Sequence, residues 1–120
     1  MNKVIGEMKV KIGKREFLLR PSFRGQAEIE DRAGVGVPAL CGQMKNQTAG
    51  VKTIAAVLYG GMVGALNEGE YPEFSFEQFG EMIVKHGYLK LYAATTQFLV
   101  SCVRTGDEKK EEPSEETAET

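Results

Sequence analysis

Residues 54–66 read IAAVLYGGMVGAL, a run without a charged residue and with glycines at positions 60, 61 and 64. This stretch decides the fold, because a run so rich in glycine fits three different structures. It fits a loop that holds phosphate, a membrane helix, or a helix packed closely against a neighbour. Each of these structures predicts a different function.

Two of the three structures do not fit the residues. A P-loop requires Gly-x-x-x-x-Gly-Lys-Ser/Thr, because the lysine and the hydroxyl reach phosphate and magnesium. No Lys, Ser or Thr follows Gly64 closely, and the adjacent Gly60 and Gly61 break the dinucleotide pattern Gly-x-Gly-x-x-Gly. The run is also too short to span a bilayer. It therefore predicts a packed helix, from about residue 51 to 66.

Small residues recur every four positions along this predicted helix, at Ala56, Gly60 and Gly64. This spacing places them in one smooth strip, where another backbone can approach closely. Three helical glycines cost roughly 2–3 kcal/mol relative to alanine, so close packing must compensate. The neighbour is either a helix of the same chain or a second copy, which would make the strip a self-association surface.

The N-terminal region predicts a β-hairpin. MKVKI (8–12) and the run around EFLLR (16–20) alternate apolar and charged residues on either side of Gly13-Lys14. Glycine in the first position of a two-residue loop favours a type II′ turn. That turn pairs Ile12 with Arg15 and Lys11 with Glu16, and it gathers one apolar face: Met8, Val10, Ile12, Phe17 and Leu19. Because a lone hairpin is marginal in water, this face must pack on helices.

Helix signals occupy the chain from Ser22 to about residue 103. Ser22 caps a helix that ends near Ala33, before Gly34, and we expect it to turn Phe23, Ala27 and Ile29 or Glu30 inward. A short helix is predicted from Pro38, with Leu40, Cys41 and Met44 on one side. The next helix begins with the capping box Ser75–Gln78 and the staple Phe74–Phe79, and it ends at Gly87. The last predicted helix covers 88–103, and its apolar stripe is Leu91, Ala94 or Thr95, Phe98, Leu99 and Cys102.

The C-terminal segment differs in composition from the rest. From Gly106 onward seven acidic residues accompany Lys109 and Lys110, so this tail carries a charge of −5 and residues 1–105 carry +3. We expect the tail to be disordered, because it has too few apolar residues to offset the entropy of ordering. The predicted fold is α+β and mainly α: residues 1–105 form one domain, an N-terminal hairpin packed on about five helices, and 106–120 form the acidic tail.

No group of side chains predicts catalysis, a metal site or a cofactor. His86, the only histidine, precedes the helix-ending Gly87 and is expected to be a cap or surface residue. One histidine and two separated cysteines cannot complete a zinc site. The other candidate residues also have simpler interpretations. We interpret Cys41 and Cys102 as buried thiols in a reducing cytoplasm, and Glu28, Glu30 and Asp31 as part of a solvated helix face. We therefore expect no enzymatic activity.

The bulk composition narrows the class of partner. The sequence has 120 residues, of which 42% are hydrophobic and 27% charged, as in an ordinary soluble domain. No cluster of Lys and Arg forms a stripe, so we expect no nucleic-acid partner. The N-terminus lacks the apolar segment of a signal peptide, and no run is long enough for a transmembrane helix, so we expect no membrane association.

Four segments, taken in order, carry a resemblance. They are a hairpin ending in LRPSF (19–23), then AEIEDRAG (27–34), IAAVLYGGM (54–62) and SFEQFGEMIVKHG (75–87). This order resembles the small tail assembly chaperones of long-tailed phages, particularly the branch shared with gene transfer agents. The resemblance covers roughly residues 6–103 and rests on packing and turn motifs.

The resemblance implies a protein of the host cytoplasm that is absent from the mature virion. Such a protein binds the tape measure protein, keeps it soluble and helps tail tube subunits polymerise around it. Because a tape measure is long, helical and apolar along one side, surplus apolar surface on a small helical domain, including the five methionines, would suit it. Many copies would coat a long rod, so a homo-oligomer is expected. The competing interpretation of these apolar residues is plain core.

The resemblance also implies a longer form made by a programmed translational frameshift, whose added domain engages the major tail tube protein. The codons of Lys109 and Lys110 would be adenine-rich and could belong to the slippery site. A gene without a slip site near codons 105–112 would remove this hypothesis. The alternative function is a virion structural component, such as a tail or connector protein, and a small enzyme or regulator is a third possibility.

Overall fold

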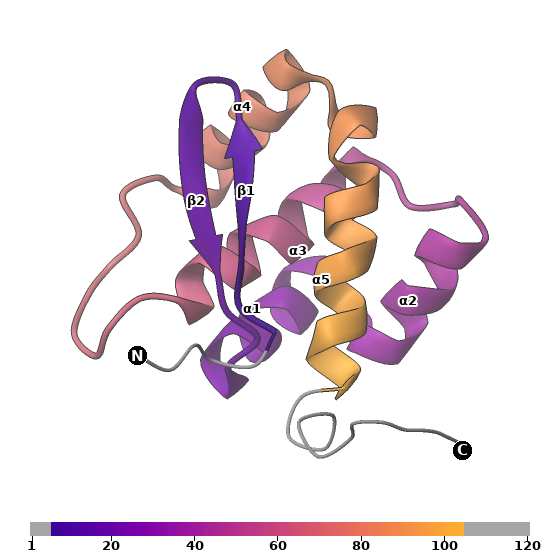
Figure 1. Cartoon of the computed structure of the whole chain (residues 1–120), viewed down its shortest axis with the longest axis horizontal. Helices are drawn as coiled ribbons and strands as arrows, with labels where there is room; N and C mark the ends of the chain where they lie inside the picture. The colour runs from indigo at the N-terminus through magenta and orange to yellow at the C-terminus, as the bar shows by residue number, and fades with distance from the viewer. Residues whose placement is uncertain (1–5, 105–120) are drawn as a thin grey trace.

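The computed structural model describes residues 6–104, which form a two-stranded antiparallel hairpin followed by five α-helices and one 3-10 helix (Figure 1). The predicted fold class is thereby confirmed. The tail over 106–120, with Lys109 and Lys110, lies outside the described residues. The elements in chain order are β1 (Met8–Ile12), β2 (Arg15–Leu19), α1 (Phe23–Ala33), α2 (Val37–Lys45), α3 (Val51–Gly64), α4 (Phe76–His86), the 3-10 helix η1 (Tyr88–Leu91) and α5 (Tyr92–Arg104).

The hairpin has the predicted register, with Ile12 opposite Arg15 and Lys11 opposite Glu16. Gly13 has a φ of 64°, and Gln47 is the only non-glycine residue with a positive φ in the described part of the chain. Lys14 therefore has a negative φ, as a type II′ turn requires. The predicted apolar face is turned into the core, where four of its members are buried and Met8 is half-buried: Val10, Ile12, Phe17 and Leu19.

Helix α3 lies at the centre of the molecule, where it contacts α1, α4, α5 and β2 (Figure 1). Every residue from Ile54 to Gly64 is buried. A helix that is apolar on all sides must be enclosed by other elements, so the uncharged stretch organises the fold around itself. It ends at Gly64, two residues before the predicted end, because the next two amides bond three residues back, to Met62 and Val63.

Helix α1 has the predicted ends, with Ser22 as N-cap and Gly34 (φ 82°) as C-cap. Ile29 is buried as predicted, but its buried partner on the helix is Gly25, and Phe23 is 88% exposed. The expectation that Phe23 turns inward is wrong. Gly25 lies against α3, and residues two apart on a helix point about 200° apart, so the contact at Gly25 sends Phe23 into solvent.

Helix α4 begins with the predicted capping box, in which Ser75 Oγ accepts from the Gln78 N–H and Gln78 Oε1 accepts from the Ser75 N–H. The Phe79 ring packs edge-on against the hairpin residue Phe17, with 5.3 Å between ring centroids. The Tyr59 hydroxyl of α3 donates to the Phe74 carbonyl at 2.9 Å. These contacts join α4 to both the hairpin and α3.

The predicted last helix is divided, because its first turn is the 3-10 helix η1 and only then does α5 begin. Its buried stripe is Leu91, Thr95, Phe98, Leu99 and Cys102, as predicted, with Thr95 in place of the alternative Ala94. Thr95 is a buried polar residue whose hydroxyl donates to the Leu91 carbonyl at 2.8 Å. This bond within the helix satisfies the hydroxyl, so the residue is compatible with the core.

Candidate functional site

The glycine strip of α3 lies against α1 of the same chain. A Cβ at Gly60 would lie 2.9 Å from the Gly25 carbonyl oxygen, and a Cβ at Gly64 would lie 2.9 Å from the Gly25 Cα. These are backbone atoms, which cannot move aside as a flexible side chain can. The two helices therefore meet backbone to backbone, around a third glycine, Gly25, that the sequence pattern did not single out. Ala56, the remaining member of the strip, is fully buried.

This arrangement decides between the two neighbours that the sequence left open. Because Gly60 and Gly64 are covered by α1, the strip is part of the interior of the molecule. It is not a surface on which a second copy could dock.

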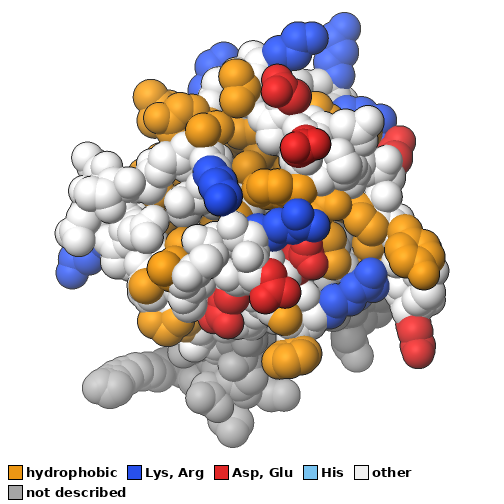
Figure 2. Space-filling view, turned by 180° about the vertical axis from the view of Figure 1, so that it is seen from behind, with side chains coloured by type: hydrophobic (Ala, Val, Ile, Leu, Met, Phe, Trp, Pro, Cys, Tyr) orange, Lys and Arg blue, Asp and Glu red, His pale blue; other side chains and the backbone are white. Residues whose placement is uncertain are grey.

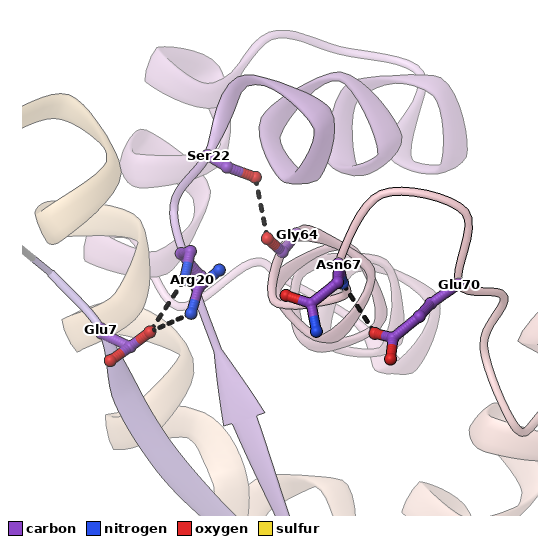
Figure 3. A network of polar contacts seen from close by, with 6 residues as sticks. All are labelled: Glu7, Arg20, Ser22, Gly64, Asn67 and Glu70. Carbon is purple, nitrogen blue, oxygen red and sulfur yellow. Dashed lines mark hydrogen bonds and ion pairs between the residues drawn. The ribbon is translucent and has the colours of Figure 1, made fainter. Parts of the chain in front are cut away.

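Ser22 joins the ends of the two helices (Figure 3). Its Oγ accepts from the Gly25 N–H at 3.1 Å and donates to the Gly64 carbonyl at 3.1 Å. One hydroxyl thus caps the start of α1 and satisfies a carbonyl at the end of α3, where the helix has no partner of its own. The Arg20 N–H donates to the Gly61 carbonyl at 3.0 Å and fixes the end of β2 to the same turn.

A half-buried ion pair lies beside this junction. Both Arg20 Nε and Nη2 donate to Glu7 Oε2 at 2.8 Å, which ties the residue before β1 to the residue after β2 (Figure 3). The loop after α3 is held nearby, because the Asn67 N–H donates to Glu70 Oε1 at 2.7 Å and Arg24 Nη2 donates to the Glu70 carbonyl at 3.1 Å. These polar contacts position loops and chain ends, and each has a structural explanation.

His86 lies at the hairpin turn, where its Nδ1 accepts from the Gly13 N–H at 2.9 Å. It therefore fastens the turn to the C-terminal end of α4, a contact between residues far apart in the sequence. The hydrogen bond that His86 forms in the structure is this one, and not a bond that caps the last carbonyls of the helix. The bond to Gly13 gives His86 a structural role.

The acidic residues of α1 are separated by their contacts. Glu30 Oε2 accepts from the Val37 N–H at 2.8 Å and caps α2, whose N-cap, Gly36, has no side chain to do so. Glu28 pairs with Arg32 one turn away at 2.7 Å. Asp31 is exposed on the same helix. Between residues 6 and 104 no group of three or more His, Cys, Asp or Glu side chains is placed to hold a metal ion.

Cys41 and Cys102 are thiols on the facing helices α2 and α5. Cys41 is half-buried, with its Sγ 3.9 Å from the Leu99 carbonyl oxygen, and Cys102 is buried. Burial, and then the neighbouring Cys41, raise the pKa of the Cys102 thiol to about 12. Burial also raises the pKa of Cys41. Raised pKa values keep both sulfurs protonated at neutral pH, which is the opposite of what a nucleophilic cysteine needs.

The surface offers a different kind of candidate, a pair of exposed aromatic residues. Phe23, at the start of α1, is 88% exposed, and Tyr71, in the loop after α3, is 86% exposed. Tyr71 lines a depression of about 570 Å³ together with Ser22 and Arg24, the two residues on either side of Phe23. Two large aromatic side chains on anchored segments are typical of a protein-binding surface. Phe23 does not itself line the depression but lies between two residues that do, and we call Phe23, Tyr71 and the depression the aromatic surface.

The aromatic surface was not found by sequence reasoning. The pattern placed Phe23 in the core, and it did not single out Tyr71. No local signal distinguishes an exposed phenylalanine at the first position of a helix from a buried one, because the direction of the side chain depends on the partner helix.

Apolar side chains reach the surface in several places between interspersed basic and acidic ones, as Figure 2 shows for one face of the molecule. Within the described range, none of the helices combines the length and the hydrophobicity that crossing a bilayer requires. Comparisons with protein-family models, curated proteins and solved structures found no match to this chain.

Proposed function

We propose that this protein is a non-catalytic tail assembly chaperone of a long-tailed phage or gene transfer agent. It binds the tape measure protein in the host cytoplasm and keeps it soluble while tail tube subunits polymerise around it. A longer frameshifted form would engage the major tail tube protein. The virion structural component remains the alternative function.

The aromatic surface carries this proposal. A protein that covers an apolar partner needs large apolar side chains in solvent on segments that do not collapse into its own core. Phe23 is held in this way by the Ser22 cap, and the loop before Tyr71 is fastened through the Arg24–Glu70 bond. The polar residues that could take part in catalysis form structural hydrogen bonds instead, which further supports a non-catalytic role. His86 accepts from the Gly13 N–H, and Glu30 accepts from the Val37 N–H.

The test is co-expression of the chain with the tape measure protein encoded beside it. We expect the tape measure protein to stay soluble and to co-purify with the wild-type chain. The double variant Phe23→Ser/Tyr71→Ser should fold normally, because both side chains lie in solvent, and should lose most of this capture. Leu89→Ser is the matched control, since Leu89 is an exposed apolar residue of η1, which follows the end of α4 at the hairpin turn, whereas Phe23 follows the other end of the hairpin.

Mass spectrometry of purified particles separates the two functions. A chaperone is absent from the particle, whereas a virion structural component is present in stoichiometric amounts. Detection of the chain in purified particles, together with failure to capture the tape measure protein, would refute the chaperone proposal and favour the structural component.

A further inference from the structure

A second surface lies between the first turns of α3 and helix α4. It is a groove of about 390 Å³. Its floor is apolar and consists of Val51, Ala55, Phe76, Gly80 and Val84. Val84 is 58% exposed, so the apolar floor continues into solvent. We call this surface the α3–α4 groove.

The floor of the groove contains a helical glycine, Gly80. It lies inside α4, where glycine is a poorer helix former than alanine. The glycines of the α1–α3 contact are needed because a Cβ would meet other backbone atoms, but a Cβ at Gly80 would meet nothing within 4 Å in the described structure. The described fold gives no packing reason for glycine at this position, nor at Gly42 of α2, but of the two only Gly80 lines the groove. A partner that approaches the floor of the groove closely would provide one.

The floor has the spacing of a surface that receives a helix. Phe76, Gly80 and Val84 recur every four residues on α4, and Val51 and Ala55 do so on α3. Rows of this spacing form the ridges between which a third helix packs. From Phe76 to Val84 the floor is about 12 Å long, which corresponds to about two turns of a partner helix.

The charged residues on the rim of the groove indicate which charges a partner helix would carry. Glu77 and Glu81 lie along the α4 side and are exposed, and neither forms an ion pair with another residue of the described part of the chain. They are one helical turn apart, so their like charges repel each other. A partner with Lys or Arg beside its apolar stripe would relieve this repulsion. Lys52, on the α3 side, would accept an acidic residue on the other flank.

Neither a second copy of the chain nor its own C-terminal segment complements the charges of this rim. A second copy docked through this face would bring together Glu77 and Glu81 of both copies with only Lys52 of each copy to neutralise them, so an excess of negative charge would remain. The tail after Gly106 is strongly acidic, with seven Asp and Glu residues, and would be repelled by the same rim.

We infer that the α3–α4 groove is a docking site for an amphipathic α-helix of another protein, with an apolar stripe of about two turns flanked by Lys or Arg facing Glu77 and Glu81. This inference goes beyond the proposed function, because it specifies the secondary structure and charge of a partner and uses a surface separate from the aromatic surface.

The test uses two synthetic helical peptides of about 18 residues, five turns of helix. Both have the same leucine stripe on an alanine background, and one carries lysines on the flank where the other carries glutamates. Binding to the full chain is measured by fluorescence anisotropy of labelled peptide. We expect the lysine peptide to bind roughly tenfold more tightly than the glutamate peptide, and less tightly as salt is raised.

Variants of the groove locate the binding. Gly80→Leu fills the floor and should weaken binding of the lysine peptide by about tenfold or more. The matched control is Gly42→Leu, because Gly42 also lies inside a helix with nothing within 4 Å of its Cβ position, but on α2. It should leave binding unchanged. The charge reversal Glu77→Lys/Glu81→Lys should invert the preference between the peptides, and it remains informative if Gly80→Leu fails to fold.

Several results would overturn the inference. They are failure of both peptides to bind, equal binding of the two, or equal weakening by Gly80→Leu and Gly42→Leu. Light scattering that finds a dimer in the wild type and a monomer in Gly80→Leu would assign the groove to a second copy instead. If Gly80→Leu still captures the tape measure protein normally while the peptide results hold, the groove serves another partner and the chaperone proposal is unaffected.

Discussion

Glycine has three different roles at single positions of this chain. Gly13 provides the positive φ of the hairpin turn. Gly25, Gly60 and Gly64 remove side chains where two helices meet backbone to backbone. Gly80 lies over open space. The same residue type therefore has opposite energetic consequences depending on what surrounds its missing Cβ.

Alanine substitutions should reveal this difference. Gly60→Ala places a Cβ against Ile29 and the Gly25 backbone, so α1 and α3 must separate, and we expect a loss of about 1–3 kcal/mol in the free energy of unfolding. Gly80→Ala meets no atom and should instead gain about 1 kcal/mol. Urea unfolding followed by circular dichroism suits this comparison, because the chain has no tryptophan. Equal effects of the two substitutions would show that the α1–α3 contact is not tight.

At the scale of elements, the ends of the helices hold the molecule together. The end of α3, the start of α1 and the end of β2 meet at one junction, where Ser22 and the Arg20 backbone satisfy carbonyls of α3 (Figure 3). At the other end of the hairpin, His86 of α4 accepts from the turn. Elements distant in the sequence are thus connected through groups that a helix or turn leaves without a partner.

Two serine caps allow the contribution of this junction to be measured. Ser22 and Ser75 are each the N-cap of an eleven-residue helix, but only Ser22 also donates to another helix. We expect Ser75→Ala to cost about 1 kcal/mol, as the loss of a cap. Ser22→Ala should cost roughly 2–3 kcal/mol, because it also leaves the part-buried Gly64 carbonyl without its donor. Chemical unfolding of the two variants gives the comparison, and equal losses would contradict a role of Ser22 in joining the helices.

At the scale of the whole molecule, one core surrounds α3 and includes the apolar face of the hairpin and the stripes of all the other helices. Cys102 belongs to this core and is removed from water by it. Unfolding exposes its thiol, so the stability of the entire fold depends on the ionisation of this group.

We expect the free energy of unfolding to fall as the pH rises above 9. The pKa of Cys102 is about 12 in the folded chain, against 9.0 for a thiol in water, so the unfolded chain loses this proton first. Well below pH 9 the thiol is protonated in both states and contributes no pH dependence. Between pH 8 and 10.5 the loss from Cys102 is about 2 kcal/mol.

The matched measurement is urea unfolding of the wild type and of Cys102→Ala at both pH values. The variant is less stable at pH 8, because it has lost buried volume, but its further loss at pH 10.5 should be smaller by about 2 kcal/mol. Identical losses in the two proteins would mean that the thiol of Cys102 ionises as readily in the folded chain as in the unfolded one.

Much of this fold follows from short-range patterns. The register of the hairpin depends on two strands of opposite alternation and a glycine turn between them, all within residues 8–19. The capping box of α4 lies within four residues. Each pattern stabilises its own local structure and needs no distant contact. For the same reason the uncharged stretch 54–66 could be recognised as a packed helix before its partners were known.

The tertiary structure alone decided what these elements present to solvent. It placed Gly25 of α1 against Gly60 and Gly64, and this contact exposed Phe23, which the helical pattern had assigned to the core. It also brought His86 to Gly13, 73 positions away. Periodicity specifies that a helix has an apolar face, but the side that is buried depends on the shape of the opposing surface. That shape exists only after the chain has folded, so the candidate surfaces of this protein could not be derived from its sequence.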